Sequence, residues 1–305
     1  MADSGATRLF PQHVAIGLLL LIGTLSALNH VAARIAFDDG AGVMLAVICR
    51  AAFSGLALLA VVLWQGHSLR LPGNCGPWQL LLGLMVALQS LCLYSAVARI
   101  PVALALLLGS LFPILLALLT WALGGARPTR RAGILMACIL LGLVFVLDLP
   151  GVLSAHGRMG SEWTIGVLFA FCSASFFTVG LWISDHRLSH LIGPVRSLYT
   201  IAIVFGSMLA VGVADFVPGG LNMPLTSTGW LGLGVLSVLY ATTFSILFIT
   251  IPRLDMPRNA PVMNSEPVAS LLFGWLVLNQ TFNELQLLGG AIVLGCIVLL
   301  AYSRN

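Results

Sequence analysis

The chain is poor in charge. Asp, Glu, Lys and Arg together make up 8% of its 305 residues, and lysine is absent. The 14 basic residues are therefore all arginines, and they are distributed along the chain without forming a basic run. This excludes a nucleic-acid partner, because binding to phosphates requires clustered basic side chains. So little charge, against 59% hydrophobic residues, also argues against a water-soluble domain.

Several motifs that carry chemistry are missing. The six cysteines show no CxxC spacing and five lie in apolar runs, which argues against a disulfide framework or a metal site. His186 and His190 have the i, i+4 spacing of a metal pair, but the acid of an HExxH motif and a third ligand are lacking. Without Walker A, GxSxG or CxxCH motifs, ATP-driven pumping and serine-hydrolase chemistry have no support. We therefore expect no cofactor and no enzymatic activity.

The chain does contain repeated apolar runs of about twenty residues, the length that spans a bilayer core of about 30 Å. These runs show neither a repeating polar face nor the alternation of a strand. Backbone groups in lipid must be satisfied within the segment, so we predict membrane-spanning helices rather than barrel strands. Ten spans are predicted, at 13–37, 42–64, 77–98, 101–123, 131–149, 162–184, 194–215, 228–251, 257–278 and 284–303.

The placement of the arginines predicts the orientation, because positively charged flanks stay in the cytoplasm. With the N-terminus inside, most arginines outside the spans fall in inner loops and tails. These are Arg8, Arg70, Arg127, Arg130, Arg131, Arg187, Arg253, Arg258 and Arg304, whereas Arg34, Arg99 and Arg158 fall outside. Both termini are therefore predicted to be cytoplasmic, which an even number of spans allows. Arg34 and Arg99 fit this topology less well than the others.

The two halves of the chain resemble each other, which indicates an internal duplication. Three landmarks recur at one constant separation, since 253 − 99, 267 − 113 and 275 − 121 all equal 154. The pairs are Arg99 and Arg253, Pro113 and Pro267, and Trp121 and Trp275; earlier in each half, Arg50 matches Arg196. We predict two five-helix repeats, residues 1–150 and 151–305. An odd number of spans in each repeat forces the two copies into opposite orientations, so they should superpose after a rotation of about 180°.

Short motifs in both halves occur in the order found in a known family. They are Leu93-Tyr94-Ser95-Ala96, Pro101, Leu111-Phe112-Pro113-Ile114, Ser265-Glu266-Pro267-Val268-Ala269 and Leu288-Gly289-Gly290-Ala291. Over almost its whole length, the chain resembles the EamA-type ten-helix permeases of the drug/metabolite transporter superfamily. The resemblance implies a bacterial inner-membrane transporter, commonly an exporter of amino acids or related metabolites, with a substrate cavity between the repeats. Where this family usually has a glutamate after the fourth and ninth helices, the chain has Gly125 or Ala126 and Asn279 or Gln280, so the role of that acid does not carry over.

Glu266 is the sharpest single signal for a functional site. It lies about nine residues into the ninth predicted span, which at 1.5 Å per residue places it about 13 Å deep, near the bilayer midplane. A charge there costs at least about 2.5 kcal/mol, so the side chain should face a cavity or a partner and titrate near neutral pH. This suits proton coupling or the binding of a substrate ammonium group. The alternative is a structural acid, bonded to an arginine or to the carbonyl left free by Pro267.

Arg50 and Arg196 occupy equivalent positions in the second and seventh spans. A guanidinium keeps its charge at any working pH and can bind a carboxylate through two parallel hydrogen bonds. Arg50, several residues inside its span, is the better candidate for binding substrate or for an ion pair. Arg196 is close enough to the end of its span to snorkel toward the cytoplasm, which is its alternative explanation.

A further set of polar and amphipathic residues lies inside the spans or at their edges. These are Asn29, His30, Gln89, Tyr94, Trp182, Tyr199, Tyr240, Asn259 and Asn264. Hydrogen bonds between helices, worth about 0.6–2 kcal/mol each, are the usual role of such groups in membranes. His30 differs from the rest because its charge can change between pH 5 and 8. Trp121 and Trp275 are interpreted as interfacial anchors.

These observations together predict an all-α, ten-helix secondary transporter that works by alternating access. The site predicted to bind substrate or couple protons comprises Glu266, Arg50, Asn29, His30, Tyr94, Arg196, Tyr199, Tyr240 and Asn264. The expected partners are a small zwitterionic or amphipathic metabolite, the lipid bilayer of an inner membrane, and protons as a candidate coupling ion, with the protein a monomer or homodimer. A membrane enzyme or lipid-handling protein using Glu266 and His30 as acid and base remains an alternative, as does an accessory membrane subunit without a polar cavity.

Overall fold

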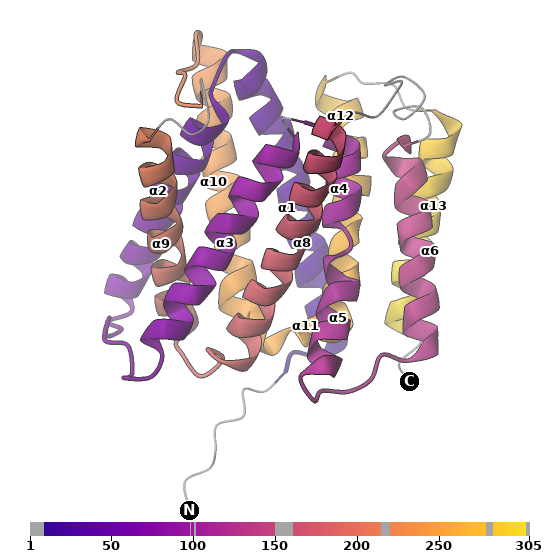
Figure 1. Ribbon diagram of the computed structural model, residues 1–305, viewed down its shortest axis with the longest axis horizontal. Helices are drawn as coiled ribbons and strands as arrows, with labels where there is room; N and C mark the ends of the chain where they lie inside the picture. Colours follow the sequence, from indigo (N-terminus) through magenta and orange to yellow (C-terminus); the bar gives the residue numbers. More distant parts are fainter. Residues whose placement is uncertain are drawn as a thin grey trace, which may run out of the picture. The chain divides into compact units, whose positions relative to one another are not determined.

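The computed structural model describes residues 9–97, 99–100, 102–149, 161–214, 220–278 and 283–302, and every regular element within them is a helix (Figure 1). The α-helices of the first half are α1 (Gln12–Asp38), α2 (Val43–Trp64), α3 (Gly76–Val97), α4 (Val102–Gly109), α5 (Phe112–Ala122) and α6 (Arg130–Val146). Those of the second half are α8 (Ser161–His186), α9 (Gly193–Val213), α10 (Ser227–Thr250), α11 (Met256–Asn259), α12 (Glu266–Leu278) and α13 (Glu284–Tyr302). Two 3₁₀ helices, η1 (Ile251–Arg253) and η2 (Ala260–Ser265), flank α11.

Seven stretches of the described residues are helical, long and apolar enough to cross a membrane. They are Gln12–Asp38, Val43–Trp64, Gly76–Leu93, Ala105–Ala122, Glu162–His186, Gly193–Val213 and Ser227–Arg253. Each coincides with one of the predicted spans, so the predicted all-helical membrane architecture is confirmed for the part of the chain that the structure describes. The count of ten spans stays a prediction.

Two of the predicted spans are broken by proline. Pro113 has no N–H to donate to the carbonyl of Gly109, four residues earlier, and α4 ends at Gly109 before α5 begins at Phe112. In the second half, a single span over 257–278 was expected, but the chain forms α11, the 3₁₀ helix η2 and then α12. Pro261 and Pro267 interrupt the backbone ladder there in the same way. Glu266 is consequently the first residue of α12 and does not lie within a continuous helix.

The order of helices in the first half recurs in the second at nearly constant separations. The starts of α2 and α9 are separated by 193 − 43 = 150 residues, and those of α3 and α10 by 227 − 76 = 151. For α4 and α11, α5 and α12, and α6 and α13, the differences 256 − 102, 266 − 112 and 284 − 130 all equal 154. The proline-broken helices therefore occupy corresponding places in the two halves.

The helices pack as two compact units, each containing segments from both halves of the sequence. The first unit comprises Met1–Pro11, Leu25–Ala87 and Gly180–Met256, and the second comprises Gln12–Thr24, Leu88–Val179 and Pro257–Asn305. The boundaries between units fall inside α1, α3 and α8.

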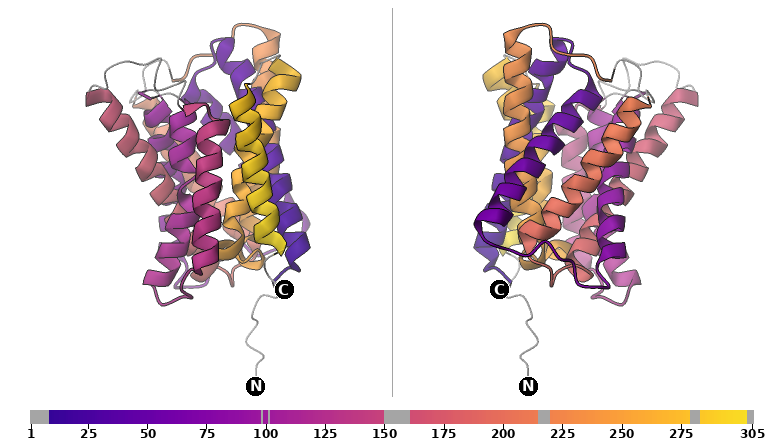
Figure 2. Two further views of the ribbon diagram at one scale, coloured as in Figure 1. Left: turned by 90° about the vertical axis from the view of Figure 1, so that its right-hand side faces the viewer. Right: turned by 90° about the vertical axis from the view of Figure 1, so that its left-hand side faces the viewer.

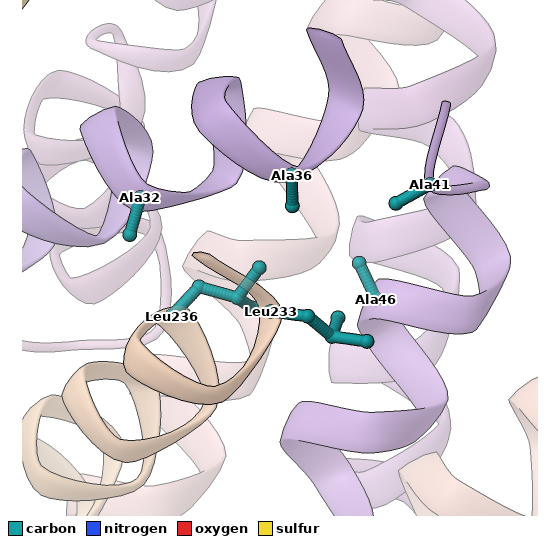
Figure 3. Packing of buried hydrophobic residues seen from close by; sticks show 6 residues of the cluster. All are labelled: Ala32, Ala36, Ala41, Ala46, Leu233 and Leu236. Carbon is teal, nitrogen blue, oxygen red and sulfur yellow. The ribbon is translucent and has the colours of Figure 1, made fainter. Parts of the chain in front are cut away.

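In the first unit, α2 packs against both α9 and α10 (Figures 1 and 2). The C-terminal part of α1 joins them through a cluster of small residues, in which Ala32, Ala36, Ala41 and Ala46 pack on Leu233 and Leu236 (Figure 3). A Cβ atom at Gly232 of α10 would lie 3.0 Å from the carbonyl oxygen of Ala32. Small side chains thus let α1 and α10 approach closely, as is common between helices in lipid.

In the second unit, α6 and α13 form the most extensive helix pair, seen side by side in Figure 2. A Cβ atom at Gly289 of α13 would lie 2.5 Å from the carbonyl oxygen of Gly142 in α6. The reverse holds as well, since a Cβ atom at Gly142 would lie 3.0 Å from the carbonyl oxygen of Gly289. The contact therefore depends on glycine at both positions.

Candidate functional site

Arg50 of α2 faces Tyr240 of α10 in the first unit. The guanidinium carbon of Arg50 is 4.2 Å from the centre of the Tyr240 ring, and both side chains are half-buried. A cation at this distance is attracted by the electron-rich ring face, by about 0.5–2 kcal/mol. The structure thus brings together two of the predicted site residues. The aromatic face holds the guanidinium in place and takes up none of its N–H groups.

Tyr240 begins a row of stacked aromatic rings along one face of α10. Its ring centre is 5.7 Å from that of Phe244, which in turn lies 4.4 Å from that of Phe248. Spacing of four residues places all three on the same side of the helix. The carbonyl oxygen of Phe248 accepts a hydrogen bond from Nη2 of Arg196. Arg50 and Arg196, matched by sequence, therefore lie at opposite ends of one aromatic row.

Arg196 of α9 is completely buried and binds backbone carbonyls. Its Nη1 donates to the carbonyl oxygens of Ser184, at 3.2 Å, and Leu188, at 2.9 Å, and its Nη2 donates to that of Phe248. Ser184 and Phe248 lie in the last turns of α8 and α10, where carbonyl oxygens have no donor within the helix. Arg196 therefore caps the C-terminal ends of two helices from a third. Its burial rules out snorkelling.

Further polar groups surround Arg196, and sequence reasoning did not single them out. Nε2 of Gln79 donates to the carbonyl oxygen of Arg196 at 3.2 Å and to Oγ1 of Thr200 at 2.8 Å. Asp185, in the last turn of α8, interacts electrostatically with Arg196 and lies 3.3 Å from Nδ1 of His186. An acid eleven residues before a buried arginine is a signal that could have found Asp185. Gln79 carried no such signal, because it binds a main-chain carbonyl.

Asn29 has a clear structural contact in the first unit. Its Nδ2 donates to the carbonyl oxygen of Leu236 in α10 at 2.6 Å, and its side chain is buried. Asn29 thus joins α1 to α10, the role expected for most polar residues of the set. His30, the next residue, is exposed.

Tyr199 lies near the start of α9, and its hydroxyl donates to the carbonyl oxygen of Leu69 at 2.6 Å. This bond ties α9 to the loop that follows α2. The side chain of Tyr94, another member of the predicted site, lies outside the described residues.

Glu266 and Asn264 belong to the second unit, at the junction of η2 and α12. Asn259, Asn264 and Ser265 are buried, and Glu266 is half-buried. A Cβ atom at Gly23 of α1 would lie 2.8 Å from Oγ of Ser265 and 3.4 Å from the backbone nitrogen of Glu266. Glycine at position 23 thus allows α1 to approach the start of α12 closely. As the first residue of α12, Glu266 places its carboxylate at the positive end of the helix dipole.

Two contacts between loops and helix starts occur in the first unit. Oδ2 of Asp39, after α1, accepts from the backbone N–H of Thr226 at 2.7 Å, and Oδ1 accepts from its hydroxyl at 2.8 Å. Nε2 of His190, after α8, lies 3.1 Å from Sγ of Cys75, the residue before α3. The two contacts share one separation, because 190 − 39 and 226 − 75 both equal 151.

The hydrogen bonds at Asp39 also set its protonation. The backbone N–H of Thr226, the N-cap residue of α10, stabilises the carboxylate and lowers the pKa of Asp39 below the usual value for aspartate. The hydroxyl of Thr226 and the backbone N–H of Leu225 act in the same direction. Asp39 is therefore ionised throughout the physiological range.

The histidines of the second half are separated by these contacts. His186 stacks on Trp182 with ring centres 5.0 Å apart, while His190 contacts Cys75. Among the residues that the structure describes, no group of three or more His, Cys, Asp or Glu side chains could hold a metal ion.

Comparison with known proteins gives matches over most of the chain. The model of the EamA-like transporter family matches residues 13–148 and 164–302. A WAT1-related chloroplastic protein of Arabidopsis thaliana is 25% identical over 267 residues, which are 83% of this chain and 61% of that protein. The chain therefore spans about three fifths of the length of this relative. A protein of known crystal structure shares the fold with a TM-score of 0.72 and 21% identity, over 93% of this chain and 97% of that one.

Proposed function

The chain belongs to the EamA-like transporter family, and we propose that this multi-pass membrane protein is a secondary transporter that exports a small zwitterionic metabolite, such as an amino acid. The proposal includes alternating access, with proton coupling or exchange as the driving force, and a bacterial inner membrane as its location. The substrate, the direction and the coupling go beyond the family match.

The observation that carries the proposal is the recurrence of broken helices at corresponding places in the two halves. The α4–α5 break and the break before α12 lie 154 residues apart. Helices interrupted in the membrane are typical of transporters built from inverted repeats, where the freed backbone groups bind substrate or ions. We propose accordingly that residues 1–150 and 151–305 are two five-helix repeats in opposite orientations, with both termini in the cytoplasm.

Arg50 and Tyr240 support a substrate with a carboxylate. The planar guanidinium can form two parallel hydrogen bonds to a carboxylate while its face rests on the aromatic ring. An amino group on the same substrate requires a negative partner, and Glu266 is the candidate among the predicted site residues. A zwitterion is thus the substrate class that suits both charges.

The test is uptake of labelled amino acids into proteoliposomes, with the wild type compared with Arg50→Lys. A lysine keeps the charge but loses the planar pair of donors, so transport should fall by about tenfold or more, equivalent to one charge-assisted hydrogen bond of about 1.4 kcal/mol. Arg34→Lys is the matched control, because Arg34 is exposed and pairs with Asp38 one turn away. Undiminished transport by Arg50→Lys would remove Arg50 from substrate binding. Recovery of the solute chemically unchanged separates transport from the alternative of a membrane enzyme.

Glu266 is our candidate for the proton-coupling group. Glu266→Gln mimics the protonated acid, so substrate exchange should persist while accumulation driven by a pH gradient disappears. The measurement is uptake with and without an imposed gradient. Gradient-driven transport unchanged in this variant would leave Glu266 with a structural role, and loss of both exchange and binding would point to direct contact with the substrate ammonium group.

A further inference from the structure

The surroundings of Arg196 contain an unusual concentration of unsatisfied polar atoms. Among the described residues, four buried atoms here have no hydrogen-bond partner: Nε of Arg196, Oε1 of Gln79, Oγ of Ser184 and Oγ of Ser197. Their residues are at most 1% exposed. We call these four residues the Arg196 cluster. Buried polar atoms are nearly always hydrogen-bonded, and leaving one unpaired costs about 1–3 kcal/mol.

The members of the cluster are already fixed by their other bonds. Nε2 of Gln79 donates to the carbonyl oxygen of Arg196 and to Thr200, so turning its amide over would set an oxygen against a carbonyl oxygen. The guanidinium is held by its bonds to Ser184, Leu188 and Phe248. These groups cannot rotate to satisfy one another without breaking bonds that they already make.

The chemistry of the unsatisfied atoms identifies what would satisfy them. Nε of Arg196 is a donor, Oε1 of Gln79 is an acceptor, and each serine hydroxyl can do both. An anion would serve the arginine but not the oxygen of Gln79, and a cation would be repelled by the guanidinium. Water both donates and accepts, and buried waters typically make about three hydrogen bonds to polar groups that are otherwise unsatisfied.

We propose that the Arg196 cluster is a buried water site, in which ordered water joins the guanidinium to Gln79 and to the hydroxyls of Ser184 and Ser197. The site lies where α8, α9 and α3 meet within the first unit. Bound water lowers the cost of keeping a positive charge away from solvent, which three carbonyl oxygens alone do not offset. It also makes the junction of these helices dependent on polar side chains.

The first test uses the direction of a change in stability. If water satisfies the two hydroxyls, Ser197→Ala and Ser184→Ala each remove a hydrogen bond and should lower the Tm in detergent by about 2–4 °C. If the hydroxyls are unsatisfied, removing them abolishes a penalty and raises the Tm. Ser54→Ala is the matched control, since Ser54 is equally buried and its hydroxyl bonds to the carbonyl oxygen of Arg50. A raised Tm in both cluster variants would overturn the proposal.

The second test detects the water itself. In X-ray radiolysis, hydroxyl radicals formed from bound water oxidise nearby side chains that bulk solvent does not reach. Phe248 and Leu188, buried residues whose carbonyls bind Arg196, should be oxidised faster than Met44 and Met208, which are equally buried and intrinsically more reactive. Faster oxidation of the methionines would contradict a water site. A Tm that rises with chloride and not with gluconate would replace water by an anion and overturn the proposal as well.

Discussion

Replacing Arg196 with methionine should destabilise the protein severely. Methionine has a similar volume but leaves the carbonyl oxygens of Ser184, Leu188 and Phe248 without their donor. Each orphaned carbonyl costs about 1–3 kcal/mol, and the removal of a buried charge returns part of that cost. Breaking a buried charged network typically costs about 3–5 kcal/mol in total. At about 2–4 °C for each kcal/mol, the Tm should fall by roughly 10 °C.

The assay is thermal unfolding of the purified protein in detergent, followed by tryptophan fluorescence. Arg187→Met is the control, because Arg187 is exposed and rests on the rings of Trp78 and Trp182 at 4.8 Å and 5.6 Å. Its loss should cost less than about 1 kcal/mol. Equal Tm values for Arg196→Met and Arg187→Met would refute the assignment of Arg196 as the cap of α8 and α10.

Three further predictions follow from the contacts. Because the folded pKa of Asp39 is lowered, its stabilising effect should be complete above about pH 4 and lost as the pH falls below that value, and Asp39→Asn should abolish this part of the acid dependence of the Tm. Gly289→Ala should force α13 away from α6 and cost about 1–3 kcal/mol, whereas Gly295→Ala, with open space around it, should not; equal stability of the two would contradict the close packing. An impermeant maleimide should label Asn222→Cys, but not Ser68→Cys, from outside intact cells, above wild-type labelling; reaction of both from one side would exclude inverted repeats.

The helices were predictable because apolar runs of about twenty residues leave the backbone few alternatives in lipid. Pro113 and Pro267 were recognised as landmarks of the duplication, yet the breaks before α5 and α12 were not predicted. A proline in a membrane helix can be accommodated by a kink, so its presence alone does not determine whether the helix continues. The position of Glu266 at the start of α12 followed from the local 3₁₀ conformation, which hydropathy does not report.

The pairing of Arg50 with Tyr240 joined two residues that had been selected separately, although their contact could not be derived from sequence. The partners of Arg196 were less accessible still. Three of them are main-chain carbonyls, which every residue carries, so no pattern of side chains distinguishes Ser184, Leu188 or Phe248 as acceptors. Asp39 and Thr226 are 187 residues apart, and nothing in either loop announces the other.

The two loop contacts show how a duplicated fold can keep a geometry and change its chemistry. Asp39 with Thr226 and His190 with Cys75 share the separation of 151 residues, so each joins the loop after a first helix of a repeat to the start of a third. If the repeats are inverted, as we propose, the contacts face opposite sides of the membrane. The Asp39 contact rests on a carboxylate that stays ionised down to acidic pH, whereas the His190 contact combines an imidazole that titrates near pH 6.5 with a thiol. Conditions on the two sides would then act on different groups, and a change in cytoplasmic pH would reach the histidine contact while leaving the aspartate contact intact.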